Sequence, residues 1–411
     1  MPARCCFLKT DRLTLGLLLT CACANAQGLI AGSGVSGVVN IFGSDLAILE
    51  AGEQRNDIPC TVVQQKPVLG FDLRFHSGYQ VTVPLKELSG QENLLTIVFR
   101  VLGEKKDQPL YFSQRIRVPS IEDSAKGDAY LQGAFDVGEG KYHVDWMMRD
   151  RSERVCASSW DTDAALAVKD KQIELSIPPG GIQRADAEQF KEEPPVQRAQ
   201  GEVPLNVKVL INFAPQNSLS ATLQPMDTSA LVSILRTLAR EPRIGKFSIT
   251  AFNMQEQRVL YRQESGDRID FPALGEALTK LSLGTVDFKL LGQKHGDTEF
   301  LTGLIQKECG TPATRPDALI FAGPKVMLDS NVSQESLNEM SDVDYPVFYM
   351  NYNLNPQAMP WKDAISHAVK HFRGYEYTIS RPRDLWFAVT EMVGRIVKSR
   401  NVRHTASIST Q

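Results

Sequence analysis

The stretch GKYHVDW at residues 140–146 alternates between apolar and polar side chains. Successive side chains on a strand point to opposite faces, so Tyr142, Val144 and Trp146 share one face. We predict a half-buried strand with Tyr142 and Trp146 as core residues and His143 on the opposite, solvated face. An aromatic carbohydrate platform is the alternative role for the two rings.

Strands of this kind recur from residue 58 to residue 183, and GYQVTVP at 78–84 is a second example. Turn signals such as HSG at 76–78 separate them. Many short strands at this spacing are typical of a β-sandwich, so we predict an all-β sandwich domain over 58–183. Asp145 and Asp150 stand apart in the pattern, and we predict no catalytic carboxylate pair here.

The composition is that of a globular protein with room for two domains. The chain has 411 residues, of which 42% are apolar and 23% charged, with a formal net charge of -3. These values exclude a disordered or fibrous chain. A mildly acidic chain without a basic stripe argues against a nucleic-acid partner.

Residues 1–26 have the pattern of a secretory signal peptide. Basic residues come first, LTLGLLLTCA at 13–22 is apolar but short, and ANA at 24–26 is a small-x-small cleavage site. We therefore predict export to the periplasm, the outer surface or the medium. The alternatives are a buried N-terminal helix and lipid attachment at Cys21 or Cys23. No later segment is apolar for long enough to span a membrane.

Three cysteines, Cys60, Cys156 and Cys309, follow the predicted signal. An exported chain can form disulfides, and Cys60 and Cys156 fall in the same predicted domain. They either pair or, like Cys309, are small buried apolar residues. The absence of a C-x-x-C motif from this part of the sequence argues against a cysteine metal site.

Two segments look like connectors. Residues 27–57 contain GSGVSG at 32–37, which matches neither a phosphate loop nor a nucleophile elbow. We expect a lightly tethered N-terminal arm there. Residues 184–204 include KEEPP at 191–195 and have little apolar content, which predicts a solvated linker between two folding units.

The pattern of apolar residues changes after residue 204. LNVKVLINF at 205–213 is a nearly continuous apolar run, typical of a strand buried on both faces. Amphipathic helices such as 227–240 and 383–399 then alternate with further strands. This alternation predicts, over 205–401, an α/β fold with a doubly wound, mainly parallel sheet, followed by a tail at 402–411.

Several segments of this half carry a resemblance to a known family. They are VKVLIN at 207–212, FSITAF at 247–252, HGDTEFL at 295–301, DALIFAG at 317–323 and GYEYTI at 374–379. In order and spacing they resemble a von Willebrand factor A domain. The two-domain chain resembles exported A-domain-related proteins of bacteria such as Acidobacteria. The resemblance implies protein–protein contact or adhesion.

The resemblance also implies a magnesium site, but the ligands are degenerate in this sequence. The family pattern is D-x-S-x-S after the first strand, a threonine before a middle helix and an aspartate after the fourth strand. NFAPQ at 212–216 replaces the first motif, Ala322 stands at the final acid position, and only Thr298 matches. Magnesium needs several hard oxygen ligands, so we predict no metal and no cofactor. Asp297 acting as a substitute ligand is the alternative.

Open α/β sheets place ligands in the crevice at the carboxyl ends of their strands, even without metal. We expect a partner-binding crevice there, with Asn351 and Asn353 adding hydrogen-bonding groups. Its predicted residues are Asn212, Ala214, Gln216, Thr298 and Ala322.

His367 and His371 stand four residues apart on a predicted helix, a spacing that suits zinc or copper. No third ligand is evident, so we interpret them as solvent-facing histidines.

These observations predict an exported, non-enzymatic protein that binds an unknown protein partner through a metal-independent domain. Two alternatives stay open. One is an exported hydrolase whose catalytic triad is assembled from distant residues, since no G-x-S-x-G or H-E-x-x-H motif occurs. The other is a metal-dependent adhesion domain with altered ligands.

Overall fold

The computed structural model divides the chain into two compact units, Met1–Ala187 and Glu188–Gln411. The boundary between them falls inside the segment predicted as a linker. The predicted signal peptide lies outside the described residues. The structure describes residues 27–30, 41–104, 109–185, 189–199, 203–217, 220, 222–281, 283, 295–309, 315–328, 330–339 and 343–409.

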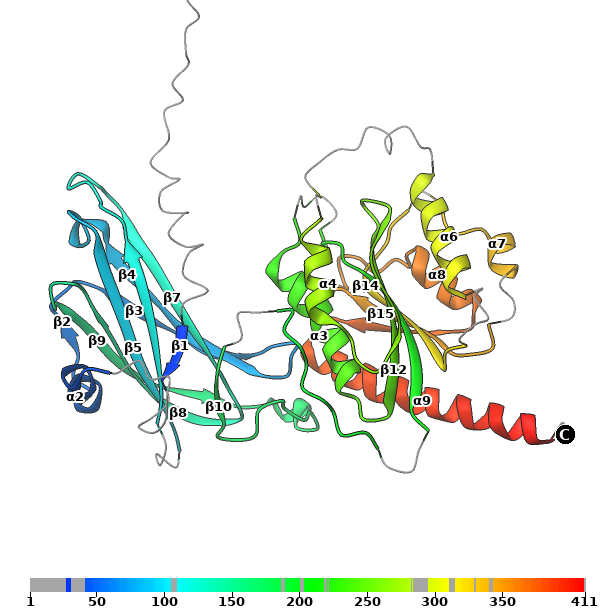
Figure 1. Ribbon diagram of the computed structural model, residues 1–411, viewed down its shortest axis with the longest axis horizontal. Coiled ribbons are helices and arrows are strands. Elements are labelled where there is room, and N and C mark those ends of the chain that lie inside the picture. The colour runs from blue at the N-terminus through cyan, green and yellow to red at the C-terminus, as the bar shows by residue number, and fades with distance from the viewer. Residues whose placement is uncertain are drawn as a thin grey trace, which may run out of the picture. The chain divides into compact units, whose positions relative to one another are not determined.

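The first unit is a β-sandwich, which confirms that prediction (Figure 1). One sheet has the strand order β1-β6-β5-β8-β9-β2 and the other has the order β10-β7-β4-β3. The strands are β1 (Gln27–Ile30), β2 (Arg55–Asn56), β3 (Thr61–Leu69), β4 (Phe75–Pro84), β5 (Asn93–Gly103), β6 (Leu110–Val118), β7 (Asp128–Val137), β8 (Gly140–Arg149), β9 (Val155–Ala164) and β10 (Ile182–Arg184).

Aromatic side chains fill the space between the two sheets. Trp146 and Tyr142 are buried there, so they are core residues as predicted and form no open carbohydrate platform. The Trp146 ring lies 5.4 Å from that of Tyr79, and Phe99 stacks on Phe112 at 4.9 Å. A disulfide joins Cys60 to Cys156, one of the two arrangements that the sequence left open.

The segment expected to be a lightly tethered arm is partly ordered on the sandwich. Strand β1 pairs with β6, and helix α2 (Gly43–Ala51) packs on the outer face of the larger sheet. Leu49 of this helix is buried against Val98 and Met147. The glycine-rich run at 32–37 gave no sign of this helix. The apolar residues that pack on the sheet, Ile48 and Leu49, come after that run in the sequence.

The second unit contains one six-stranded sheet with the order β13-β12-β11-β14-β15-β16. Helices lie on both sides of the sheet (Figure 1). The strands are β11 (Leu205–Asn212), β12 (Ile244–Asn253), β13 (Arg258–Gly266), β14 (Ala318–Pro324), β15 (Val347–Tyr352) and β16 (Tyr375–Ile379), and the helices are α3 (Pro225–Arg240), α4 (Phe271–Leu278), α6 (Gly296–Cys309), α7 (Gln334–Asn338), α8 (Ala364–His371) and α9 (Pro382–Ser409).

The predicted class, a doubly wound α/β protein with a mainly parallel sheet, is wrong for this chain. Every described pairing in the two sheets of the sandwich is antiparallel, and so is the pairing of β12 with β13. Parallel pairing is confined to the other four pairs of the second unit's sheet. The predicted class described the fold expected for residues 205–401 behind a sandwich, and the ten described strands of the sandwich make the chain mainly antiparallel.

Local sequence explains where several helices begin. Helix α3 starts with Pro225, and the side chains of Gln224 and Asp227 form a capping box. Its predicted inward residues Leu231, Ile234, Leu235 and Leu238 are buried. Helix α9 extends to Ser409, so part of the predicted tail is helical. Among the described residues, no helix is both long and apolar enough to cross a membrane.

Candidate functional site

The strand ends of the second unit, predicted as a partner-binding crevice, are occupied by their own hydrogen bonds. Asn212 ends β11 and is buried. Its Oδ1 accepts a hydrogen bond from the Met254 backbone N–H at 3.2 Å. Gly323 of the neighbouring strand leaves no room beside it, since a Cβ there would lie 2.8 Å from the Asn212 Cβ. Asn212 therefore ties β11 to the chain that follows β12.

The remaining predicted crevice residues divide into two groups. Gln216 and Asn353 do meet, with Gln216 Nε2 3.4 Å from Asn353 Oδ1. Asn351 donates to Glu376 Oε1 at 2.9 Å. Ala214 and Ala322 are buried and offer no polar group. These contacts, with that of Asn353 Nδ2 to the Met359 carbonyl oxygen, engage the amide nitrogens, whereas the buried Asn351 Oδ1 has no hydrogen-bond partner among the described residues.

Thr298 belongs to a different cluster. It lies in the first turn of α6, and its Oγ1 is 3.0 Å from the Ser330 carbonyl oxygen and 3.1 Å from Ser330 Oγ. Among the described residues, the hydrogen bonds of Thr298 do not include one to Asn212 or Gln216. Asp297, the alternative ligand, accepts from the Thr298 backbone N–H at 2.7 Å. The threonine hydroxyl thus holds the loop around Ser330.

The two helical histidines also have local roles. His367 Nδ1 lies 2.8 Å from the Asp363 carbonyl oxygen within the same helix region. The His371 ring packs edge-on against Phe372, with centroids 5.4 Å apart. Neither belongs to a group of metal-ligating side chains in the described part of the chain.

A different cluster, on the sandwich, was missed by the sequence reasoning. His76 lies on β4 with Asp136 opposite it on β7, and Asp72 lies in the preceding turn. His76 Nδ1 is 2.7 Å from Asp136 Oδ1, and Nε2 is 3.0 Å from Asp72 Oδ1. Residues 76–78 were interpreted as a turn, but β4 begins at Phe75 and already includes them.

This cluster does not have the geometry of a metal site that uses all three residues. The two carboxylates lie on opposite edges of the imidazole ring, so one ion cannot contact both carboxylates and the same ring nitrogen. Arg74 adds a positive charge, with Nη1 3.5 Å from Asp136 Oδ2. No hydroxyl or thiol among the described residues is hydrogen-bonded to His76. The cluster is best understood as a clamp that holds the β3–β4 turn against β7.

The clamp keeps the imidazole charged. Burial alone would lower the pKa of His76, but the hydrogen bonds to Asp136 and Asp72 outweigh burial and raise this pKa to about 10. Burial likewise acts to raise the pKa of Asp72, yet the hydrogen bond to His76 holds it below its usual value. The result is an ion cluster with a structural role.

The acids Asp145 and Asp150, expected to stand apart, each have structural partners. Asp145 is buried and accepts from Arg100 Nε at 2.7 Å, and His143 Nε2 lies 3.1 Å away. Asp150 accepts from Arg154 Nε at 2.9 Å. His143 is only half exposed, so the prediction of a solvated side chain was incomplete.

An arginine-lined groove of about 700 Å³ opens on the outer face of the larger sandwich sheet, beside α2. Strand register brings three of its residues into one row across the sheet. Arg115 on β6 lies opposite Thr96 on β5, and Thr96 lies opposite Arg149 on β8. The complete lining is Phe42, Glu92, Asn93, Leu94, Thr96, Arg115, Arg117, Val118, Pro119, Arg149, Asp150, Arg151 and Glu153.

Among the arginines of the groove, some form ion pairs within the sandwich and others do not. Arg149 is bound by Glu153 at 2.9 Å, lies 3.5 Å from Asp45, and stacks over the Phe42 ring at 4.7 Å. The side chains of Arg115, Arg117 and Arg151 are exposed and have no hydrogen bond or ion pair within the described residues. Guanidinium groups carry only donors, so these three exposed side chains can donate to water or to the acceptors of a ligand.

The sequence contains a signal that would have found two of them. QRIRV at 114–118 alternates arginine with apolar residues on a strand, which places Arg115 and Arg117 on one face. Arg151 is not predictable in this way, because it follows β8 and reaches the groove through tertiary structure.

Comparison with known proteins adds little. No family model matches the chain, and no curated protein does. A Northeast Structural Genomics Consortium target aligns over 28% of this chain and 95% of its own, with 11% identity and a TM-score of 0.18. A glycosyl hydrolase family 2 member from Bacteroides cellulosilyticus aligns over 79% of this chain and 40% of its own, with 10% identity and a TM-score of 0.20.

A β-glucuronidase from Bacteroides uniformis aligns over 74% of this chain and 39% of its own, with 12% identity and a TM-score of 0.18. The chain thus spans about two fifths of both enzymes' lengths. Such low scores establish neither fold nor function, and none of these matches shows a von Willebrand A domain.

Proposed function

We propose that this chain is an exported, non-enzymatic binding protein whose arginine-lined groove engages an acidic segment of a partner protein. The observation that carries the proposal is the set of three arginines, Arg115, Arg117 and Arg151, whose exposed side chains lack partners within the described residues. Carboxylates match the planar guanidinium fork with two parallel hydrogen bonds.

A protein partner fits the groove better than a purely ionic polymer. Phe42 is 57% exposed and Leu94 is 37% exposed, and both line the groove beside the arginines. Protein interfaces are enriched in arginine and aromatic residues at their centres. The partner segment should therefore carry apolar side chains between its acids.

The spacing of the arginines also specifies the shape of that segment. Arg115 and Arg117 are two residues apart on β6, which separates their Cα atoms by roughly 6.6 Å. An extended peptide with acids at alternate positions repeats the same spacing. We infer an extended segment with acids at every second residue.

Export is part of the proposal and rests on two features. The sequence begins with the predicted signal peptide. The Cys60–Cys156 disulfide supports the same compartment, because such bonds persist mainly outside the reducing cytosol.

The test is binding of a fluorescein-labelled peptide with the repeat Asp-Val-Glu-Val, measured by fluorescence anisotropy at low salt. Its control peptide replaces each acid by the matching amide. We expect saturable binding of the acidic peptide alone. The double substitution Arg115→Glu and Arg117→Glu should weaken it about 30-fold, since it removes two ion pairs and adds repulsion.

Lys141→Glu combined with Lys169→Glu is the matched control, because it makes the same charge change at exposed lysines outside the groove. Equal weakening by both double variants would mean that only net charge matters, and the groove proposal would be wrong. Binding of heparin through the arginines, with no binding of the peptide, would replace the protein partner by an acidic polysaccharide.

A further inference from the structure

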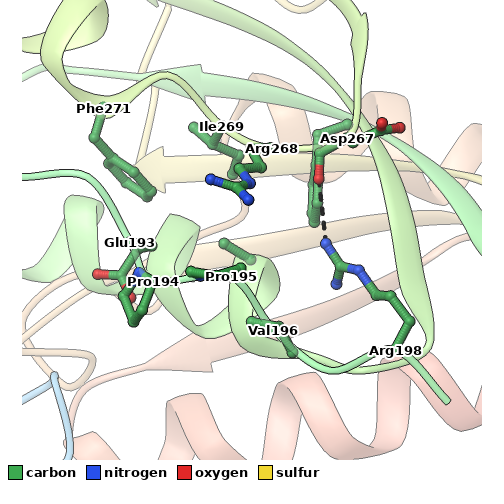
Figure 2. A pocket seen from close by; sticks show the side chains of 11 residues that line it. Glu193, Pro194, Pro195, Val196, Arg198, Asp267, Arg268, Ile269 and Phe271 are labelled. Atoms are coloured by element: carbon green, nitrogen blue, oxygen red, sulfur yellow. Dashed lines mark hydrogen bonds between the residues drawn. The ribbon is translucent and has the colours of Figure 1, made fainter.

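Residues 189–199, part of the segment 184–204 that was expected to be a solvated linker, are docked on the second unit. Glu193 forms an ion pair with Arg236, whose Nε lies 2.7 Å from Oε1, and accepts a hydrogen bond from Arg240 Nε at 2.8 Å; both arginines are on α3. Arg198 donates to the carbonyl oxygen of Asp267 at 3.2 Å (Figure 2), and to that of Glu241 at the same distance. The segment is thus held on both sides of Pro194 and Pro195.

A cavity of about 200 Å³ lies between these two attachments (Figure 2). Its apolar floor consists of Ala239, Phe247, Ile269 and Phe271, all of them buried. The docked segment forms the opposite wall with Pro194, Pro195 and Val196. Proline fixes its own backbone φ and donates no backbone hydrogen bond, so this wall resists collapsing onto the floor.

The lining of the cavity includes two exposed charged side chains, Asp267 and Arg268, and Figure 2 shows the Asp267 carboxylate pointing away from the docked segment. Glu193 is neutralised by two arginines, and Arg198 is bound to backbone carbonyls. Arg268 is exposed, and its guanidinium has no hydrogen bond or ion pair within the part of the chain that the structure describes. Figure 2 shows this guanidinium across the space from the docked segment.

We propose that the cavity binds a small aromatic carboxylate, with its ring between Val196 and the Phe247 and Phe271 side and its carboxylate on Arg268. The size agrees, because an apolar cavity of roughly 150 Å³ in another protein holds a benzene molecule. An apolar wall with one convergent charged group is the usual composition of a small-molecule site. This site lies in the second unit and is independent of the arginine-lined groove.

Calorimetry with the full chain after the predicted cleavage site tests the proposal, using benzoate, benzamide and benzylamine as probes. The three share a ring of one size and differ in charge. We expect benzoate to bind at least about tenfold more tightly than benzamide, and benzylamine to bind weakest, because only benzoate forms a charge-assisted pair with Arg268. Isotope-labelled methyl groups of Ile269 and Val196 should shift in the NMR spectrum on benzoate addition.

Arg268→Gln should abolish the preference for benzoate over benzamide, and Val196→Phe should block all three probes by filling the cavity. Arg381→Gln is the matched control, since it removes another exposed arginine of the same unit, outside the cavity. The proposal is wrong if benzoate does not bind, or if Arg268→Gln keeps the preference. Should Val196→Phe not fold, the exposed Arg268 variant still decides between these outcomes.

Discussion

The strand ends of the second unit and the outer face of the sandwich both gather polar side chains, but these side chains differ in how far they are paired within the fold. Asn212, Gln216 and Asn353 hydrogen-bond to neighbouring groups. Arg115 and Arg117 have no such neighbour among the described residues. An amide carries both a donor and an acceptor and is easily satisfied within a fold, whereas a guanidinium needs acceptors that the sandwich face does not supply. A polar surface is therefore a better candidate site when its groups cannot satisfy one another.

The largest expected effect is a loss of stability that is confined to the sandwich. Cys60→Ala with Cys156→Ala should lower the free energy of unfolding of the sandwich by about 3 to 5 kcal/mol, because the disulfide closes a long loop of the unfolded chain. The second unit should unfold as before. Urea denaturation in a Trp361→Phe and Trp386→Phe background follows the sandwich through Trp146 and Trp160.

Cys309→Ala is the control, as this free cysteine belongs to the second unit. It should leave the transition that Trp146 and Trp160 report unchanged, and an unchanged transition in the Cys60→Ala and Cys156→Ala variant would contradict the prediction.

The next effect concerns the buried amide of Asn212 in the second unit. Asn212→Ala should destabilise that unit by about 2 kcal/mol, since it leaves the Met254 N–H without its acceptor in a buried position. Affinity for the acidic peptide should not change. If the variant is as stable as wild type and loses a partner instead, the strand ends are a binding surface after all.

A smaller and pH-dependent effect is expected at the clamp on the sandwich. Because the folded pKa of His76 is about 10 and the unfolded value is ordinary, its contribution is full below about pH 6.5 and disappears as the pH rises through 10. His76→Gln should lower stability by about 1 kcal/mol at pH 6, a value reduced for the half-exposed side chain. The difference from wild type should shrink towards pH 10.5.

Chemical denaturation of both proteins across this pH range measures the difference. Gln80→Ala, an uncharged change on the same strand, should give a curve parallel to that of wild type. A His76→Gln curve that is also parallel to wild type would mean that the imidazole is not charged in the folded state.

The smallest effect is expected at Gln216. Its side chain is half exposed and makes one long hydrogen bond of 3.4 Å. Gln216→Ala should change stability by no more than about 0.5 kcal/mol. Denaturation beside Asn212→Ala checks this, and equal losses for the two variants would show that burial does not distinguish these amides.

Local sequence patterns predicted those strands and helices that bury one apolar face of a single segment. Alternation over 140–146 predicted the strand and the burial of Tyr142 and Trp146, and helical periodicity predicted the buried face of α3. The same rules failed for features that depend on contacts between segments far apart in the sequence. They predicted a class with a doubly wound, mainly parallel sheet over 205–401, although most described strand pairs of the chain are antiparallel. They also predicted a solvated linker over 184–204, although Glu193 is bound to α3.

The sequence by itself determined the binary pattern, because side-chain periodicity follows from backbone geometry over a few residues. Tertiary structure alone decided which polar groups meet. His76 finds Asp136 sixty residues later through strand register, and Arg151 joins Arg115 and Arg117 from a different strand end. Pairing across a sheet depends on how the whole chain folds back on itself, which no local window of sequence contains.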